Sequence, residues 1–254
     1  MIIDEDENNE WILLDDSDEI NMINNFSKIN IKNNIKQIFN DNKKYILCID
    51  IGVINLGLAG IVCDNNYKFR EVVGIDLIDI TTFAYCSKNC KLNHTKTFSD
   101  WMEHIFEYYQ EVFDNVDKII LERQPPCGFV VIEQLIYSRY RNKCELVCPK
   151  SIHKFYNISH KSYENRKLFM EEKAFNHISS DYIKKEFLSF NRKHDLADAI
   201  CMGIYWLSLY HEKYMLNEKK KQILAECNKK YHYELGMSFD EWLSYFKYEP
   251  EEFI

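Results

Sequence analysis

The stretch KKYILCIDIG, residues 43–52, decides the fold class of this 254-residue chain. Two lysines precede an apolar run of strand length and a glycine ends it, a pattern typical of a buried β-strand. Two further strands are expected over residues 56–64 and 67–80, joined by a turn at an Asn-Asn pair. The chain is therefore expected to open its folded part with a three-stranded meander.

After the meander, the expected elements alternate between helix and strand. They are a helix over 98–112, a strand over 117–123, a helix over 130–141, a short strand over 145–149, and helices over 162–178 and 195–215. The order β-β-β-α-β-α-β-α-α predicts an α/β fold, a mixed five-stranded sheet with helices on its faces. This is the element order of an RNase H-like core.

Three parts of the chain are expected. They are an acidic, partly disordered leader (1–43), an RNase H-like domain (44–213) and a helical C-terminal extension (214–254). The first twenty residues hold nine acids and no base, a composition typical of disorder. A solubilising tail is the usual role of such a charge run. A peptide that binds a protein partner, or an internal mimic of DNA charge, is the alternative.

Charge is distributed unevenly along the chain. The net charge is −8, but residues 21–254 hold 32 bases against 31 acids, and residues 123–193 hold fourteen bases against seven acids. Binding to phosphates depends on the local field of one face, so the total charge does not exclude a nucleic-acid partner. A solvated surface of mixed charge is the alternative interpretation.

The compartment follows from the cysteines and the N-terminus. No apolar run approaches the roughly 20 residues of a membrane helix, so no membrane partner is expected. The acidic N-terminus does not resemble a secretory signal. Nine cysteines, an odd number spread through the expected elements, favour reduced thiols in an intracellular, reducing compartment.

Four acids lie in or at the ends of otherwise apolar elements. Asp50 lies in the first strand, Glu122 ends the strand IILE, and Asp195 and Asp198 lie three apart in HDLADAICMGIYW. A spacing of three places both aspartates on one helix face. Taken singly, each acid is explained by a cap, a turn or an ion pair. Four at the ends of three buried elements instead favour a cation site, because buried carboxylates are costly unless paired or bound to a cation.

The chemistry of this donor set is specific. Carboxylate oxygens are the ligands of Mg²⁺, for which Mn²⁺ is expected to substitute, and clustered carboxylates can hold two such ions. An ion pair of this kind activates a water and stabilises the leaving oxygen of a phosphodiester. Metal-dependent phosphodiester hydrolysis is therefore the expected reaction.

Five segments resemble a known family. They are IDIGVINLG (49–57), IILERQ (119–124), LVCPKSIHK (146–154), SYENRKL (162–168) and HDLADAI (194–200). In the same order, they are similar to motifs of the poxvirus and fungal mitochondrial Holliday-junction resolvases, relatives of bacterial RuvC. The resemblance covers about residues 45–213, and the first, second and last segments together are its most specific part.

The resemblance implies a homodimer that binds branched DNA and resolves four-way junctions by paired symmetric nicks, with Mg²⁺ held by the four acids. Arg123 and Gln124 would lie beside the scissile strand. Asn55 would hold the turn after the first strand, and His194 would contact the attacking water or a phosphate. With the Asn-, Ile- and Lys-rich composition, the resemblance suggests a large DNA virus and action at the site of viral DNA replication in the host cell.

A basic segment is the candidate DNA surface. Residues 137–169 hold eight bases against two acids, with tyrosines and phenylalanines interleaved. The bases are Arg139, Arg141, Lys143, Lys150, Lys154, Lys161, Arg166 and Lys167. They are expected to supply salt-sensitive phosphate contacts, and the aromatics either stack on unpaired bases or belong to the core.

Other functions stay open from the sequence. IDIGVINLGLAGI also resembles the first phosphate loop of actin-like kinases and ATPases, but no second Asp-x-Gly turn is present. An RNase H-like nuclease for RNA–DNA hybrids or other branched DNA would use the same chemistry. A DNA- or protein-binding relative without activity is a further alternative, although all four acids are present.

A zinc site is a separate hypothesis. Cys86, Cys90 and His94 follow one another at steps of four, and Cys144 and Cys148 are also four apart. Zinc sites usually have more closely spaced cysteine pairs, so free buried cysteines are the simpler interpretation.

Overall fold

The computed structural model describes residues 43–52, 54–83, 90, 92, 97–126 and 129–235. Its strands are β1 Lys43–Ile51, β2 Asn55–Asp64, β3 Phe69–Asp79, β4 Lys118–Glu122 and β5 Cys144–Val147. Its helices are α3 Phe98–Tyr108, α4 Gln110–Asn115, α5 Val130–Arg139, α6 Pro149–Phe155, α7 Tyr163–His177, α8 Asp181–Ser189 and α9 Lys193–Leu235.

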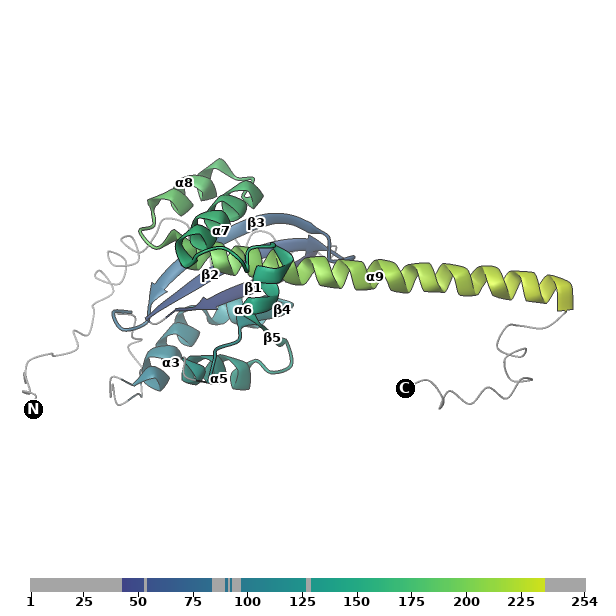
Figure 1. The fold of residues 1–254 in the computed structure, drawn as a ribbon. Helices are drawn as coiled ribbons and strands as arrows, with labels where there is room; N and C mark the ends of the chain where they lie inside the picture. Colours follow the sequence, from purple (N-terminus) through teal and green to yellow (C-terminus); the bar gives the residue numbers. More distant parts are fainter. Residues whose placement is uncertain are drawn as a thin grey trace, which may run out of the picture.

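The strands form one mixed sheet in the order β3-β2-β1-β4-β5 (Figure 1). The first three strands are antiparallel neighbours, and β1, β4 and β5 run parallel. Parallel neighbours need a crossover connection, and helices supply it here. The predicted α/β fold with a mixed five-stranded sheet and flanking helices is therefore confirmed.

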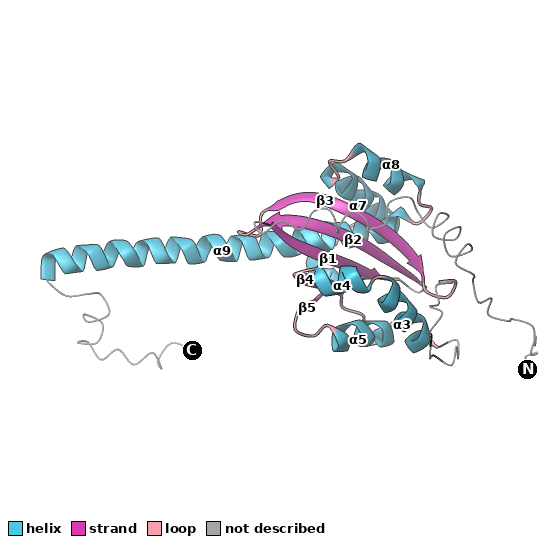
Figure 2. Cartoon of the chain, turned by 180° about the vertical axis from the view of Figure 1, so that it is seen from behind, coloured by secondary structure: helices cyan, strands magenta, loops and turns pink. Residues whose placement is uncertain are grey.

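Each face of the sheet is covered by its own group of helices (Figures 1 and 2). Leu47 and Ile49 of β1 pack with residues of α3, α4 and α5 on one face. Ile46 and Cys48 pack with residues of α6 to α9 on the other. Successive side chains of a strand point to opposite faces, so a continuous apolar run such as YILCI is required where both faces are buried.

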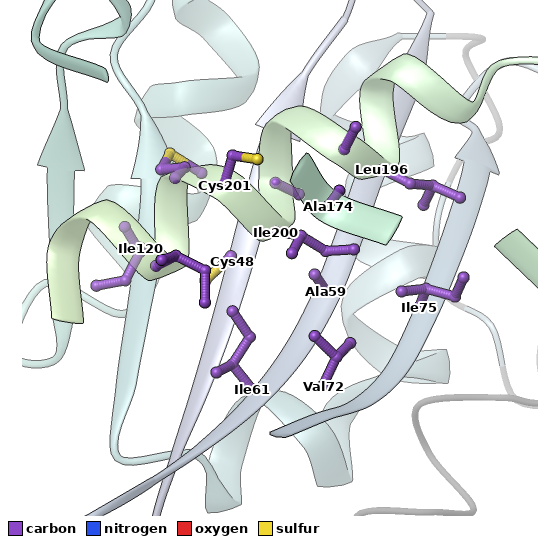
Figure 3. Close-up of a cluster of buried hydrophobic side chains, with 14 of the residues drawn as sticks. Cys48, Ala59, Ile61, Val72, Ile75, Ile120, Ala174, Leu196, Ile200 and Cys201 are labelled. Atoms are coloured by element: carbon purple, nitrogen blue, oxygen red, sulfur yellow. The ribbon is translucent and has the colours of Figure 1, made fainter. Parts of the chain in front are cut away.

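The first part of α9 lies across the sheet. Leu196, Ile200 and Cys201 of this helix pack over Cys48 and Ile61 of the strands (Figure 3). Beyond the sheet, α9 continues as a single helix that projects away from the domain (Figure 1). The helix does not break at residue 213, so the predicted C-terminal extension continues the last helix of the domain. The predicted domain boundaries stay predictions.

The structure differs from the expected elements at three places. The helix expected over 98–112 is interrupted at Tyr109, whose hydroxyl donates a 2.5 Å hydrogen bond to Asp76 of β3. Helix α6 was not expected. It begins at a proline, and the first position of a helix suits proline because the N–H that proline lacks would have no partner within the helix. Helix α8 was also not expected, and Ser180 caps it by accepting a hydrogen bond from the amide of Ile183.

Predictions about the leader lie outside the described residues. Among the helices that the structure describes, none combines the length and the hydropathy needed to cross a bilayer. Six cysteines whose side chains the structure describes are free: Cys48, Cys63, Cys90, Cys144, Cys148 and Cys201.

Candidate active site

Two of the four predicted acids lie side by side at the carboxyl ends of β1 and β4. The parallel register pairs Ile49 with Leu121, which sets Asp50 next to Glu122. Asp50 follows Ile46 and Cys48 at even spacing, so its side chain points to the face that α9 covers. The two carboxyl groups share a hydrogen bond, and Glu122 also accepts one from the backbone of Ile51.

Helix α9 brings the other two acids to the same edge. Asp195 and Asp198 lie in its first two turns, while Leu196 between them is fully buried against the sheet. The helix can approach this closely because β2 has a glycine beside Asp50. A Cβ atom at Gly57 would overlap the carbonyl oxygen of Asp195 and lie 2.6 Å from its carbonyl carbon. The missing side chain thus lets the two pairs of acids approach each other.

The electrostatics of the strand acids indicate a surplus of negative charge. Burial raises the pKa of Asp50 well above its usual value, and the neighbouring Glu122 and Asp198 raise it further. Burial also raises the pKa of Glu122, although the hydrogen bonds from Asp50 and from the Gln124 amide oppose that shift. Carboxyl groups that raise one another's pKa need a cation before all of them can ionise.

Asp198 shares this environment. Burial, followed by the charges of Glu122 and Asp195, raises its pKa to about 7, and the Lys167 ammonium on α7 acts in the opposite direction. Lys167 is therefore close enough to the acid cluster to stabilise its ionised form.

Asp195 has two basic neighbours. The Arg192 Nε atom donates a 2.8 Å hydrogen bond to Asp195 Oδ2, and His194 Nε2 lies 3.1 Å from Asp195 Oδ1. Burial lowers the pKa of His194, and the neighbouring Lys167 contributes to that shift. Arg192 was not predicted from the sequence; its position three residues before Asp195 was the available signal.

The donor set suits a hard divalent cation. The four acids supply oxygen ligands, and the raised pKa values of Asp50, Glu122 and Asp198 indicate a lack of positive charge around them. Within the described ranges, however, no three acidic, thiol or imidazole side chains form a group arranged to enclose a metal ion.

A pH dependence of stability follows from Asp198. The folded protein keeps the Asp198 proton up to about pH 7, whereas an ordinary aspartate releases it near 3.8. Between these values the folded state binds more protons, so the free energy of unfolding falls as pH rises and the loss is complete above pH 7. Asp198 alone contributes a decrease of at most about 4 kcal/mol between pH 4 and pH 8, at about 1.4 kcal/mol per pKa unit. The raised pKa values of Asp50 and Glu122 add to the decrease that urea denaturation in EDTA should show.

The matched control for this pH dependence is Asp198→Asn, which cannot ionise. The variant should lose the part of the decrease that Asp198 contributes and keep the part that Asp50 and Glu122 contribute. Mg²⁺ added at pH 8 should stabilise the wild type more than the variant. Equal pH profiles for the two proteins would contradict the assignment of the effect to Asp198.

Gln124 connects the two strand ends. Its side-chain amide donates to Glu122 Oε2 at 2.8 Å and to the Ile51 carbonyl at 3.3 Å. Its backbone amide donates to the buried Glu133 of α5 at 2.6 Å. Gln124 therefore holds Glu122 in place, and its predicted place beside the scissile strand stays a prediction. Glu133 was not predicted, because one acid in the helix VVIEQ gives no signal by spacing.

The turn after β1 is tight. Gly52 donates its amide hydrogen to the Asn55 carbonyl over 2.8 Å, and Asn55 is buried as the first residue of β2. The turn lies next to Asp50, and the prediction that the Asn55 side chain holds the turn stays a prediction.

The predicted basic DNA surface divides into two groups. Arg139 pairs with Glu103 of α3 at 2.6 Å, and Lys143 donates to the carbonyls of Asp114 and Val116. Lys143 precedes β5 at the amino end of the parallel strands, opposite the acids. The structure therefore does not bring Arg139 and Lys143 to the acid cluster, and the adjacent Arg141, which lies over the Tyr137 ring, stays with them.

The second group lies on the side of the acids. Arg123 is exposed directly after Glu122, and Lys150 begins α6 just beyond the carboxyl end of β5. On α7, Lys167 lies 4.4 Å from the Tyr163 ring and acts on Asp198, while Arg166 donates to the Lys161 carbonyl. Lys154, near the C-terminal end of α6, is also exposed.

The zinc hypothesis is only partly covered by the structure. Cys86 and His94 lie outside the described residues. Cys144 is buried and Cys148 exposed, and no metal group includes them within the described part of the chain.

Comparisons with known proteins agree with the motifs. The model of a family described as Poxvirus A22 protein matches residues 44–211. The fowlpox virus resolvase, solved with substrate Holliday junction DNA, is 20% identical over 65% of this chain and 97% of that chain, with a TM-score of 0.49. The yeast mitochondrial Holliday junction resolvase is 17% identical over 71% and 86%, also with a TM-score of 0.49. RuvC of Thermus thermophilus is 10% identical over 69% and 96%, with a TM-score of 0.42. No curated protein matches the chain.

Proposed function

The chain belongs to the Poxvirus A22 protein family, and we propose that it is a Holliday-junction resolvase, a nuclease that cuts four-way DNA by metal-dependent hydrolysis. The membership confirms the resemblance inferred from the motifs. The observation that carries the proposed chemistry is the meeting of four acids from β1, β4 and α9 at one edge of the sheet, where burial and mutual repulsion raise the pKa values of three of them.

Asp50, Glu122, Asp195 and Asp198 would hold Mg²⁺, with Mn²⁺ as a substitute. When bound, such an ion activates a water and stabilises the leaving oxygen of the phosphodiester. The chain's own contribution is placement. Gln124 holds Glu122 toward Ile51, and the close approach at Gly57 holds the start of α9 against β2, beside Asp50 of β1.

Basic groups beside the acids would bind the DNA strand. Arg192 is half-exposed and now neutralises Asp195, so it is free to turn to a phosphate once a cation takes its place. His194 has a lowered pKa, stays neutral at neutral pH and can accept a proton from the attacking water or donate a hydrogen bond to a phosphate. Arg123, Lys150 and Lys167 would contact phosphates on either side.

The two sets of basic residues, one near α3 and one on the side of the acids, are expected to differ in their effect on DNA binding. Arg166→Gln with Lys167→Gln should weaken binding to a four-way junction and reduce the slope of log affinity against log salt by about 1–2, at about 0.9 for each phosphate that is no longer neutralised. Arg139→Gln with Arg141→Gln is the matched control with the same change of charge, and should leave the slope nearly unchanged. Fluorescence anisotropy in Ca²⁺ at several salt concentrations measures both. The opposite ranking would place the DNA on the α3 side of the domain.

The experiment that tests the function compares a labelled synthetic four-way junction with linear duplex and an RNA–DNA hybrid, each in Mg²⁺ or EDTA. Paired symmetric nicks in the junction, only with Mg²⁺, are the expected result. Cutting of the hybrid instead would assign the same acids to another RNase H-like nuclease. No cutting of any substrate would contradict the proposal.

A symmetric pair of nicks requires two active sites, so we propose a homodimer as the working form. Family membership supports action at the site of viral DNA replication in the host cell. We also propose that the acidic leader, residues 1–43, binds a protein partner.

A further inference from the structure

An exposed aromatic ring lies beside the acid cluster. Tyr163 is the first residue of α7 and is 57% exposed, and α7 packs against α9, the helix that carries two of the four acids. Ser162 already caps α7 by accepting a hydrogen bond from the Asn165 amide, so the helix does not need the tyrosine in order to begin. Burial in the core does not explain the ring either, because most of it faces solvent.

Two basic groups connect the ring to the acids. The Lys167 ammonium lies 4.4 Å from the centre of the Tyr163 ring, and the same ammonium acts on Asp198. The Tyr163 hydroxyl is close enough to Arg192 to act on its charge. Arg192 in turn donates a 2.8 Å hydrogen bond to Asp195. The ring therefore neighbours two cations that each act on a different acid of the site.

The surroundings of the ring suit a nucleotide. An ammonium covers one face of an aromatic ring, and the exposure of Tyr163 leaves room for a second partner. The base of a nucleotide can stack on the ring while its phosphates pair with Lys167 and Arg192. An apolar side chain of a protein partner would use the ring and leave both cations without a counter-charge.

Stacking on a base requires a base with a free face. Inside a linear duplex, the neighbours of each base cover both of its faces, and unstacking it costs free energy. At the branch point of a four-way junction the stack is interrupted, so base faces become accessible. Phosphate contacts fix the position of the DNA but form equally with linear and branched strands. A ring beside the acids can therefore distinguish branched DNA from linear duplex.

We propose that the Tyr163 ring stacks on a base with a free face at the branch point, next to the phosphate that is cut, and so favours four-way junctions over linear duplex. This inference rests on the proposed function, because it takes the four acids as the place where DNA is cut. Lys167 and Arg192 bind the phosphates beside that base.

Tyr163→Leu tests the role of the ring, because it keeps an apolar side chain but cannot stack. It should weaken binding to a four-way junction by about 5- to 100-fold, the range for one stacked base, and change binding to linear duplex by less than about twofold. Tyr163→Phe keeps the ring and should bind both DNAs as the wild type does. Fluorescence anisotropy in Ca²⁺, in which the DNA is not cut, measures both affinities.

Tyr182→Leu is the matched control. It removes another exposed tyrosine from the first turn of a helix, α8, which packs against the edge strand β3, whereas the acids lie on β1, β4 and α9. This variant should bind the junction and the duplex with wild-type affinity.

The salt dependence separates stacking from a role of the ring in holding Lys167. Loss of a stacked base leaves the slope of log affinity against log salt unchanged, whereas loss of one phosphate contact reduces it by about 0.9. A Tyr163→Leu variant that weakens junction and duplex binding equally, with a reduced slope, would overturn the proposal and leave the ring as a support for Lys167. Wild-type binding of the junction by this variant would overturn it as well.

Fluorescence of 2-aminopurine, a base analogue that is quenched when it stacks, reports the contact itself. With the analogue at the branch point and protein at saturation in Ca²⁺, the complexes of wild type and Tyr163→Phe should emit less light than the complex of Tyr163→Leu. Equal emission from the three complexes would overturn the proposal. Cleavage of the same junction by the wild type in Mg²⁺ is recorded separately. Cleavage together with equal emission would remove only the role of Tyr163, whereas no cleavage would contradict the proposed function.

Discussion

Asp195→Asn is expected to abolish cleavage of a four-way junction while binding of the junction stays within a few-fold of wild type. Asp195 is 5% exposed at the start of α9, and its charge raises the pKa of both Asp50 and Asp198. An amide of the same shape keeps the packing but supplies one anionic ligand fewer to a cation. We expect a loss of at least about 10³-fold in the single-turnover rate, the scale seen when an essential catalytic group is removed.

The measurement separates chemistry from binding. Binding is followed in Ca²⁺ by anisotropy, and cleavage is started by adding Mg²⁺ to the preformed complex. Asp181→Asn is the matched control, since it removes the same charge from an exposed position at the start of α8. The control should cut at the wild-type rate. Full activity in Asp195→Asn would remove this residue from the site, and a failure to bind would assign it to DNA contact.

Gly57→Ala is expected to reduce the cleavage rate by about 10²-fold, although no charged or polar side chain changes. The added methyl group would overlap the carbonyl oxygen of Asp195, so the first turn of α9 must move away from β2. Gly57 pairs with Asp50 in the sheet, and the displacement therefore separates Asp195 and Asp198 from Asp50. A misplacement of about 1 Å in an active site costs activity on the order of 10²-fold.

Gly203→Ala is the control that separates displacement of the site from loss of stability. A Cβ atom at Gly203 would lie 2.5 Å from Cys48 Sγ and from Ile61 Cδ1, in the core two turns beyond Asp195. Both variants should lose about 1–3 kcal/mol of stability through overpacking. At a temperature where both are folded by circular dichroism, only Gly57→Ala should be slow at saturating DNA. Equal rates would show that the close contact at Gly57 does not position the acids.

The sheet and the acids were predictable because both depend on local patterns. Apolar runs bounded by charge and glycine identified the strands, and the spacing of Asp195 and Asp198 set them on one helix face. The interruption at Tyr109 was not predictable in this way, because the hydroxyl that accompanies it bonds to Asp76, thirty-three residues earlier. A periodicity within one helix carries no information about such a partner.

The basic segment shows the same limit. Residues 137–169 read as one positive surface in sequence, yet Arg139 pairs with Glu103 at one end of the sheet while Lys167 acts on Asp198 at the other. Helix α5 ends and β5 begins within this segment, so consecutive bases are carried to opposite ends of the domain. A count of basic residues along the sequence does not show that the chain crosses from one end of the sheet to the other between them.

The sequence by itself determined the order of the strands, the four candidate acids and the family resemblance, because apolar periodicity and residue spacing act within a few turns or one strand. Only the tertiary structure decided which side chains meet. The parallel register of β1 and β4 joined Asp50 to Glu122, and the crossing of α9 over Gly57 added the two aspartates.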